Sequence, residues 1–447
     1  MRDLAPLYTA QEMKAAEAGH DVPTLMERAG RAVAEEALRR FPDARSFGAV
    51  CGGGANGGDG RIAVDVLRQA GREAREGLEG EVLIDALFGT GFRGEPRPEA
   101  AALIEAMNAS GKPIVAVDLP SGVDADTGEI AGAAVRAAVT VTMHARKVGL
   151  EVAPGRFHAG DVVVANIGLE SRDTDARLVT PEILRRVPSK RPEDNKYTAG
   201  AVLVVGGSPG MTGAVCLSAS AAFRADAGYV TVCAPRESLG VIEARLLEAV
   251  KRPVEEVFDV LPRHRALALG PGLGRGDEQR ALVRRLLEET ELPAVVDADA
   301  LFGLQPFTRS APTVLTPHSG ELGRLLGRDS AWVDAHRLEA VAEAAERFGC
   351  VCLLKGADTL VAAPDGVGDG VLVCPLRHPS LATAGSGDVL TGVTAAFLAK
   401  GLDARVAAAA AAMACDEAAG LGPDRGLVAS DVVELLPQAL GRHDAAL

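Results

Sequence analysis

The sequence predicts an α/β protein built from two three-layer α/β/α domains. Short, continuously apolar segments such as AVLVVGG and PIVAVDLPSG end in glycine- or aspartate-rich turns and alternate with helical segments, which is typical of parallel strands buried on both faces. The 447 residues are enough for two or three domains of about 100–200 residues each. A polar, proline-containing stretch at 171–195 separates two such blocks, so we expect one domain at residues 1–170 and another at 174–447.

The composition limits the classes of function. The chain has 47 basic and 61 acidic residues and a formal net charge of −14, so attraction to a nucleic-acid backbone is not expected. Its N-terminus, MRDLAPLYTAQEM, lacks the apolar core of a signal peptide, and no apolar segment approaches the ~20 residues of a membrane span. The seven cysteines include no CxxC pair, which favours reduced, buried thiols. We therefore expect a cytoplasmic protein that binds neither nucleic acid nor membrane.

The N-terminal block begins with two helical segments. TAQEMKAAEAG starts at Thr9, a residue type that caps helices, and VPTLMERAGRAVAEEALRRF has apolar residues at helical spacing. Five strands follow, in FGAVCGGG, EVLIDALFG, PIVAVDLP, AAVTVTMHA and GDVVVANIG. Only REAREGLEG lies between Gly71 and the second of these strands, too few residues for a strand of ~5 and a helix of ~11. We expect a short edge strand or a loop there, with the helix missing.

The turns of this block carry its polar residues. GGANGGDG, residues 53–60, ends a strand and opens a helix, and backbone N–H groups in such a loop favour an anion. Asp85, Asp118 and Ser121 follow other strands, at the sheet edge where ligands of α/β proteins bind. A single strand-end aspartate is often only a cap or a turn residue, but three acid-bearing turns at one edge favour a site. Their oxygen atoms are also suitable ligands for a monovalent cation.

The order LMERAG, GGANGGDG, DALFGTG, VDLPSG and HAGDVVVANIGL resembles the Rossmann-like epimerase domain of NAD(P)H-hydrate repair enzymes. The resemblance implies a K⁺ ion held by Asn56, Asp85 and Ser121, and Asp118 as the catalytic residue that faces the hydrated nicotinamide ring. It implies a substrate pocket lined by Ala55, Asn56, Gly57, Gly58, Asp59, Gly89, Thr90, Gly91, Phe92, Arg93, Gly94 and Glu95. Ala55 stands where the family usually has a second asparagine, so one polar contact to the substrate is lost.

The C-terminal block repeats the alternation of strands and helices. We expect its strands in AVLVVGGSPG, GYVTVCAP, ALALGPGLG, AVVDADAL, TVLTPHSGE and VCLLKGADTLVAAP. TAGSGD then leads into the helix VLTGVTAAFLAKG, and an alanine-rich helix follows at about 404–420.

The most informative segment of this block is TAGSGDVLTG, residues 383–392. Backbone donors at 384–387 would form an anion hole for a transferring phosphate, and Asp388 could take a proton from a hydroxyl that attacks this phosphate. The alternative is a capped helix with a flexible entry. The neighbouring motifs GPGLG, DADAL, TPHSGE and KGADT are weak singly but agree with the first interpretation.

In this order the motifs resemble the NAD(P)H-hydrate dehydratase branch of the ribokinase-like superfamily, over residues 178–436. The resemblance implies that the hydrated nucleotide contacts Ala214, Gly272, His318 and the catalytic Asp388. It implies that ADP or ATP contacts Lys355, Gly356, Ala357, Asp358, Thr359 and Gly387, and for the transfer of a phosphoryl group we expect a Mg²⁺ ion at the phosphate. It also suggests a homo-oligomer. Asn195 replaces a histidine that the family commonly has.

Together the two resemblances imply a metabolite-repair enzyme with two activities. One interconverts the R- and S-forms of hydrated NAD(P)H, and the other dehydrates the S-form with ADP, releasing NAD(P)H, AMP and phosphate. A first alternative is a sugar or vitamin kinase, which would release a stable phosphorylated compound. A second alternative treats the N-terminal block as a binding module, and an unchanged epimerisation rate in Asp118→Ala would favour it.

Overall fold

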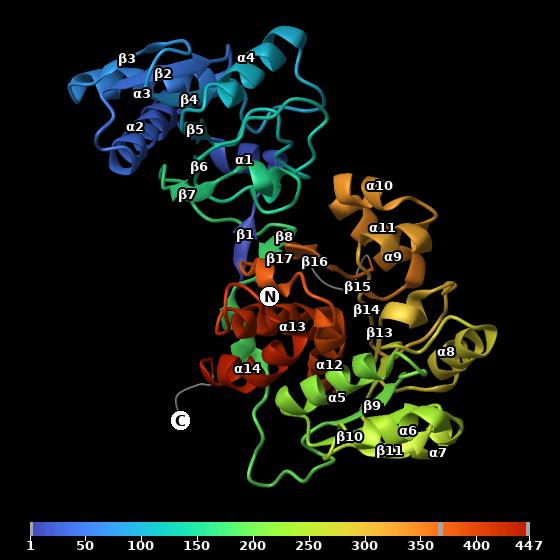
Figure 1. Ribbon diagram of the computed structural model, residues 1–447. Coiled ribbons are helices and arrows are strands. Elements are labelled where there is room, and N and C mark those ends of the chain that lie inside the picture. Colours follow the sequence, from blue (N-terminus) through green and yellow to red (C-terminus); the bar gives the residue numbers. More distant parts are fainter. Residues whose placement is uncertain (1–2, 365–369, 444–447) are drawn as a thin grey trace. The chain divides into compact units, whose positions relative to one another are not determined.

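The computed structural model describes residues 3–364 and 370–443 and has two compact α/β units (Figure 1). The first unit is Met1–Arg177, with Asp334–Arg337 grouped with it, and the second comprises Leu178–Val333 and Leu338–Leu447. The chain therefore passes from one unit to the next inside the polar stretch at 171–195. Within the described ranges, no helix combines the length and apolarity that crossing a membrane requires.

The N-terminal unit is a parallel sheet with the order β3-β2-β4-β5-β6-β7. The strands of this sheet are β2 (Ser46–Cys51), β3 (Glu73–Glu76), β4 (Val82–Ala86), β5 (Ile114–Val117), β6 (Val139–Met143) and β7 (Asp161–Ala165). The short strand β1 (Ala5–Leu7) of the same unit lies outside this sheet. The helices of the unit are α1 (Ala10–Glu17), α2 (Val22–Arg40), α3 (Ala55–Gln69) and α4 (Pro98–Ala109). The expectation after Gly71 is confirmed: β3 is a short edge strand, and β4 follows it without a helix.

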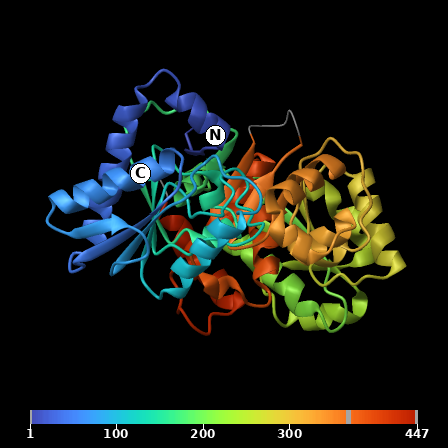
Figure 2. The same ribbon diagram turned by 90° about the horizontal axis from the view of Figure 1, so that it is seen from above.

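Two apolar clusters cover the two faces of this sheet. Val33, Val64 and Phe47 belong to the cluster that packs α2 and α3 on one face. Ile104 and Met107 of α4 pack on the other face. The unit is therefore a three-layer α/β/α sandwich, and burial of these side chains supplies the main stabilising term at about 25 cal/mol per Å² of apolar surface. Figure 1 and Figure 2 show the alternation of helices and strands from two directions.

The sheet of the C-terminal unit has the order β8-β17-β16-β15-β14-β13-β12-β9-β10-β11. Its strands are β8 (Ala176–Leu178), where the chain enters the unit, β9 (Ala201–Val205), β10 (Tyr229–Ala234), β11 (Val250–Pro253), β12 (Ala266–Leu269), β13 (Ala294–Val296), β14 (Thr313–Leu315), β15 (Val351–Leu354), β16 (Asp358–Ala362) and β17 (Val371–Pro375). The strands β15, β14, β13, β12, β9, β10 and β11 are neighbours in this order, and each pair of neighbours among them is parallel. The β15–β16 and β16–β17 pairs are antiparallel.

Helices cover both faces of this sheet as well. The helices of this unit are α5 (Thr212–Arg224), α6 (Arg236–Glu243), α7 (Val257–Val260), α8 (Asp277–Glu289), α9 (Ser319–Leu326), α10 (Ser330–Ala335), α11 (Arg337–Phe348), α12 (Ser386–Ala399), α13 (Ala404–Ala419) and α14 (Ala429–Gly441). The alanine-rich helix is confirmed as α13, buried along nearly its whole length. Its small side chains let it pack closely against α12 and α14.

One segment expected to contain a single strand contains two. VCLLKGADTLVAAP forms two antiparallel strands, β15 and β16, joined by a turn at Lys355–Gly356–Ala357. Thr359 closes this turn, because its Oγ1 donates to the carbonyl of Gly356 at 2.8 Å. The polar residues KGADT interrupt the apolar run at the reversal, and the residues on both sides of the turn are buried.

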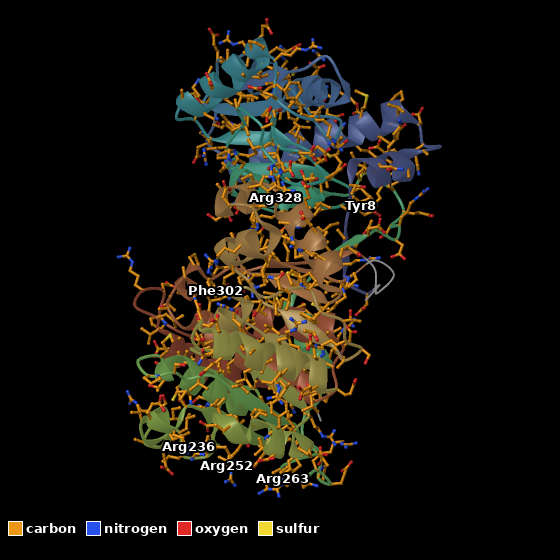
Figure 3. All side chains as sticks on the ribbon, turned by 90° about the vertical axis from the view of Figure 1, so that its right-hand side faces the viewer. Tyr8, Arg236, Arg252, Arg263, Phe302 and Arg328 are labelled. Carbon is orange, nitrogen blue, oxygen red and sulfur yellow. The ribbon has the colours of Figure 1, made fainter. Side chains whose placement is uncertain are left out.

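Figure 3 labels three arginines of this unit, Arg252 of the edge strand β11, Arg236 at the start of α6 and Arg263. Arg236 pairs with Glu255 at 3.6 Å and Arg252 with Glu256 at 3.8 Å. Charged side chains on an edge strand discourage pairing with another chain. This basic group is therefore partly neutralised by acids of the same unit.

Candidate functional site

The N-terminal unit contains a pocket of about 920 Å³ at the carboxyl ends of its strands. Residues that the sequence predicts for this pocket and that line it are Ala55, Asn56, Asp59, Gly89, Thr90, Gly91, Phe92, Arg93 and Glu95. Asp118 lines it too, as do Glu17 of α1 and Met26 of α2, which sequence reasoning missed. Gly57, Gly58 and Gly94 are not among its lining residues. Gly57 and Gly58 instead allow close packing, because a Cβ on Gly57 would meet the backbone of Gly52 and a Cβ on Gly58 would meet the side chain of Met26.

Helix α3 begins at Ala55, directly after the glycine loop, and its N-cap Gly54 makes no side-chain cap. The free N–H groups of the first turn are therefore available at the pocket. A Cβ on Gly57 would lie 1.9 Å from the carbonyl oxygen of Gly52. Only glycine lets the helix start so close to the end of β2.

We predict that Gly57→Ala lowers the stability of the N-terminal unit by about 1–3 kcal/mol, the usual cost of overpacking. The obstructing atoms belong to the backbone of Gly52, so no side-chain rotation relieves the contact. Scanning calorimetry of the full chain measures the effect. Gly53→Ala is the matched control, because a Cβ there meets nothing within 4 Å. Equal melting temperatures for the two variants would contradict the prediction.

Asp118 has a left-handed backbone with φ of +66°, which is rare for a residue with a side chain. Its Oδ1 accepts hydrogen bonds from Lys147 Nζ at 2.5 Å and from the Met143 N–H at 3.1 Å. Lys147 is completely buried and also donates to the Met143 carbonyl at 2.7 Å. The strained backbone thus aims a carboxylate, compensated by one buried ammonium group, into the pocket. Lys147 was missed because it lies outside the glycine motifs, although it follows β6 at the same sheet edge.

Two further carboxyl groups face the pocket. Burial raises the pKa of Asp59 to about 8, with the charges of Asp118 and Glu17 acting in the same direction. Burial, followed by the charge of Asp118, also raises the pKa of Glu17. The three acids therefore differ in environment, since only Asp118 has the contact with Lys147.

Asp85 and Ser121 lie behind the pocket. Asp85 is fully buried, and Ser121 donates to it through Oγ at 2.6 Å and through its N–H at 2.8 Å. Burial raises the pKa of Asp85 to about 6, against the hydrogen bonds from Ser121 and Leu87. Asn56 donates through Nδ2 to the carbonyl of Phe88 at 2.9 Å, and Phe88 N–H donates to Ser121 Oγ at 2.9 Å. Phe88 thus links Asn56 to Ser121, and Ser121 in turn contacts Asp85.

The loop at 89–95 is held in place by Arg93. This guanidinium pairs with Asp124 at 3.3 Å and also with Asp126. The rings of Phe88 and Phe92 stack with centroids 4.7 Å apart. Arg93 therefore orders the pocket wall in addition to lining the pocket.

In the C-terminal unit, Asp388 lies in the first turn of α12. The N-cap, Gly385, has φ of +89° and no side-chain cap, so the first N–H groups of the helix remain available for an anion. Burial raises the pKa of Asp388 to about 7, and the charge of Asp297 adds to this while Lys355 opposes it. A carboxyl group that titrates near neutrality is suited to proton transfer.

Asp297, at the end of β13, organises the side chains next to this helix. Its Oδ1 accepts from Lys355 Nζ at 2.8 Å and its Oδ2 accepts from Thr391 Oγ1 at 2.7 Å. Lys355 also lies 3.7 Å from Glu321. Burial lowers the pKa of Lys355, but Asp297 and Glu321 outweigh burial and raise it overall. A Cβ on Gly387 would lie 3.4 Å from Lys355 Nζ, so the ammonium group is at the entrance of the predicted anion hole.

The other predicted contacts of this unit lie at the same edge of the sheet. Ala214, in α5, and Gly272, after β12, are neighbours, because a Cβ on Gly272 would lie 3.3 Å from the Ala214 methyl group. His318 caps α9, and its Nδ1 accepts from the Gly320 N–H at 3.0 Å.

The turn at Lys355–Thr359 is only partly accessible. Asp358 and Thr359 are 1% and 2% exposed. A nucleotide at this turn would therefore meet Lys355, Gly356 and Ala357 first.

Two family models match the chain. One is described as NAD(P)H-hydrate dehydratase and matches residues 202–438. The other is described as YjeF-related protein N-terminus and matches residues 22–75 and 72–149.

Curated relatives and a solved structure agree with these matches. The chain is 37% identical to the bifunctional NAD(P)H-hydrate repair enzyme Nnr of Moorella thermoacetica, over 97% of this chain and 96% of the relative. It is 32% identical to the enzyme of the same name from Escherichia coli, over 92% and 88%. The ADP/ATP-dependent NAD(P)H-hydrate dehydratase of Bacillus subtilis, co-crystallised with ATP and Mg²⁺, is similar with a TM-score of 0.54 and 29% identity, over 59% of this chain and 98% of that one.

Proposed function

The chain belongs to the family of bifunctional NAD(P)H-hydrate repair enzymes, and from this we propose that it performs both reactions of that name. The N-terminal unit interconverts the R- and S-forms of hydrated NADH and NADPH. The C-terminal unit dehydrates the S-form with ADP and releases NAD(P)H, AMP and phosphate. The observation that carries the proposal is the pairing of two carboxylates with two uncapped helix starts, Asp118 beside α3 and Asp388 within α12.

Dehydration needs a better leaving group than hydroxide. In the proposed mechanism Asp388 takes the proton of the ring hydroxyl, which attacks the terminal phosphorus of ADP, and AMP leaves. The N–H groups at the start of α12 and the ammonium group of Lys355 stabilise the charge on the transferred phosphoryl group. The phosphate ester then leaves the ring, and loss of the neighbouring proton restores the double bond.

Magnesium fits this site by the chemistry of its donors. Asp297 and Glu321 place carboxylate oxygens around Lys355, and carboxylates with nucleotide phosphates are the ligands that Mg²⁺ prefers. Bound there with ADP, the ion supplies charge neutralisation on the phosphates. The similar ADP/ATP-dependent dehydratase of Bacillus subtilis was co-crystallised with ATP and Mg²⁺, which supports an adenine nucleotide with the same ion for this chain.

Potassium fits the N-terminal unit. Asp85 is a fully buried carboxyl group, and among the residues that the structure describes it forms no ion pair with a basic side chain. A buried carboxylate is stable only when paired or bound to a cation. We propose that Asn56, Asp85 and Ser121 hold K⁺, which compensates this charge and orders the loop after β4.

We predict that KCl raises the melting temperature of the N-terminal unit more than choline chloride at the same ionic strength. A cation at 100 times its Kd stabilises the folded state by about 2.7 kcal/mol, and each kcal/mol corresponds to about 2–4 °C for a unit of this size. Asp85→Asn removes the buried charge and with it the difference between the two salts. Asp65→Asn, on the exposed side of α3, should keep the difference. A K⁺ effect that survives in Asp85→Asn rules out the site.

The decisive experiment follows the products of the full chain with hydrated NADH, ADP and Mg²⁺. Recovery of NADH with equal amounts of AMP and inorganic phosphate supports the proposal. A stable phosphorylated compound would instead identify a small-molecule kinase. The proposal extends to a homo-oligomer in the cytoplasm, which gel filtration with light scattering and cell fractionation test.

A further inference from the structure

The pocket of the N-terminal unit contains a buried carboxyl oxygen without a partner. Asp59 is 8% exposed and lines the pocket together with Asp118. Its Oδ1 is buried, and no group within residues 3–364 or 370–443 forms a hydrogen bond with it. An unpaired polar atom in such a position is costly unless a ligand or a proton satisfies it. The atom is therefore available to a group that enters the pocket.

Burial, and after it the charges around Asp59, decide the protonation state of this carboxyl group. Asp118, after β5, and Glu17, of α1, are the charged groups that raise its pKa, together with the larger effect of burial, to about 8. Lys147 Nζ donates to Asp118 Oδ1 at 2.5 Å, so the positive charge of Lys147 is compensated by Asp118. At neutral pH Asp59 is consequently an O–H donor, whereas the Oδ1 of Asp118 accepts hydrogen bonds from Lys147 Nζ and the Met143 N–H. Two carboxyl groups with different environments in one pocket are the usual arrangement of an acid and a base.

We propose that Asp59 is a second catalytic residue of the epimerase reaction, the acid that protonates the departing ring hydroxyl, while Asp118 is the base for the incoming water. This inference rests on the proposed function of the pocket. The two carboxyl groups come from different elements, helix α3 and the end of β5, and both line the pocket.

The step balances without a further reactant. The hydroxyl-bearing carbon of the hydrated ring is bonded to the ring nitrogen. Asp59 gives its proton to the hydroxyl, the C–O bond breaks, water leaves, and the nitrogen lone pair forms a C=N bond. Water then attacks the other face of this carbon, the electrons of the C=N bond return to nitrogen, and Asp118 takes the extra proton. The pocket opens to solvent, which returns the proton to Asp59.

The test uses the full chain, one purified hydrate epimer and water enriched in ¹⁸O. The parental protein should incorporate one ¹⁸O atom for each inversion, and its rate should fall above about pH 8 as Asp59 loses its proton. Asp59→Asn should reduce kcat by about 100-fold and remove the alkaline fall. Asparagine has the shape of the neutral acid, so the fold should be kept. Asp65→Asn makes the same change on the same helix with a side chain that is 67% exposed, and it should behave as the parent.

The possible results of this experiment separate the role of Asp59, the departure of the hydroxyl and the epimerase activity itself. A parental rate with an intact alkaline fall in Asp59→Asn overturns the role of Asp59 and leaves the epimerase activity standing. Inversion by the parental protein without ¹⁸O incorporation overturns departure of the hydroxyl, and this measurement does not depend on how the variant folds. A parental protein that inverts neither epimer overturns the proposed function, and this inference with it.

Discussion

Replacing Asp388 by asparagine is expected to slow ADP-dependent dehydration by about 10²–10⁴-fold, the usual contribution of a positioned general base. The side chain lies in the first turn of α12, where the uncapped N–H groups can hold the phosphoryl group. Asparagine keeps the shape of the side chain but cannot take the proton of the ring hydroxyl. Production of NADH from the S-hydrate, followed by absorbance, measures the loss.

The pKa of Asp388 also predicts how the rate of dehydration changes with pH. Burial and Asp297 raise the pKa of Asp388 to about 7, and the base must be deprotonated to act. The parental rate should therefore rise with pH through about 7 and then level off, whereas the residual rate of Asp388→Asn should lack this rise. Because the charged form is disfavoured by burial, the asparagine variant should melt no lower than the parent at pH 8.

Two controls accompany the Asp388 experiment. Asp424→Asn makes the same change at an exposed position of the same unit and should leave dehydration unchanged. Epimerisation by Asp388→Asn itself should also persist, because Asp118 belongs to the other unit. Dehydration at the parental rate in Asp388→Asn would refute the proposed role of this carboxylate.

Replacing Lys147 by methionine is expected to destabilise the N-terminal unit by about 3–5 kcal/mol, because it leaves the buried Asp118 carboxylate without its counter-charge. Lys147 has no exposed surface and donates to Asp118, to Thr142 Oγ1 at 3.0 Å and to the Met143 carbonyl. Scanning calorimetry should show a lower melting temperature, and epimerisation should be lost with it.

A double variant separates charge from packing. Lys147→Met with Asp118→Asn removes both charges, so much of the lost stability should return while epimerisation stays absent. Lys14→Met, on the exposed side of α1, is the matched control and should melt as the parent does. If Lys147→Met melts at the parental temperature, the ion pair does not support the structure around Asp118.

Local sequence patterns predicted most of the architecture. Thr9 and Glu12 form the capping box that begins α1, and the small-residue loop before Asp388 leads into α12 as expected. The shortened connection after Gly71 could also be predicted, since it follows from counting residues. These features depend on hydrogen bonds and steric effects between neighbours in the chain, which a sequence displays directly.

What the sequence by itself determined is the alternation of strands and helices and the placing of acids and glycines at the carboxyl ends of strands. Only the tertiary structure decided which of these groups meet. Lys147 lies 29 residues from Asp118, and Thr391 lies 94 residues from Asp297, distances along the chain at which no periodicity carries information. The unpaired Oδ1 of Asp59 is likewise a property of the folded pocket. The physical reason is that burial and the charges of neighbours, which set the protonation of each carboxyl group, exist only after the strands have assembled.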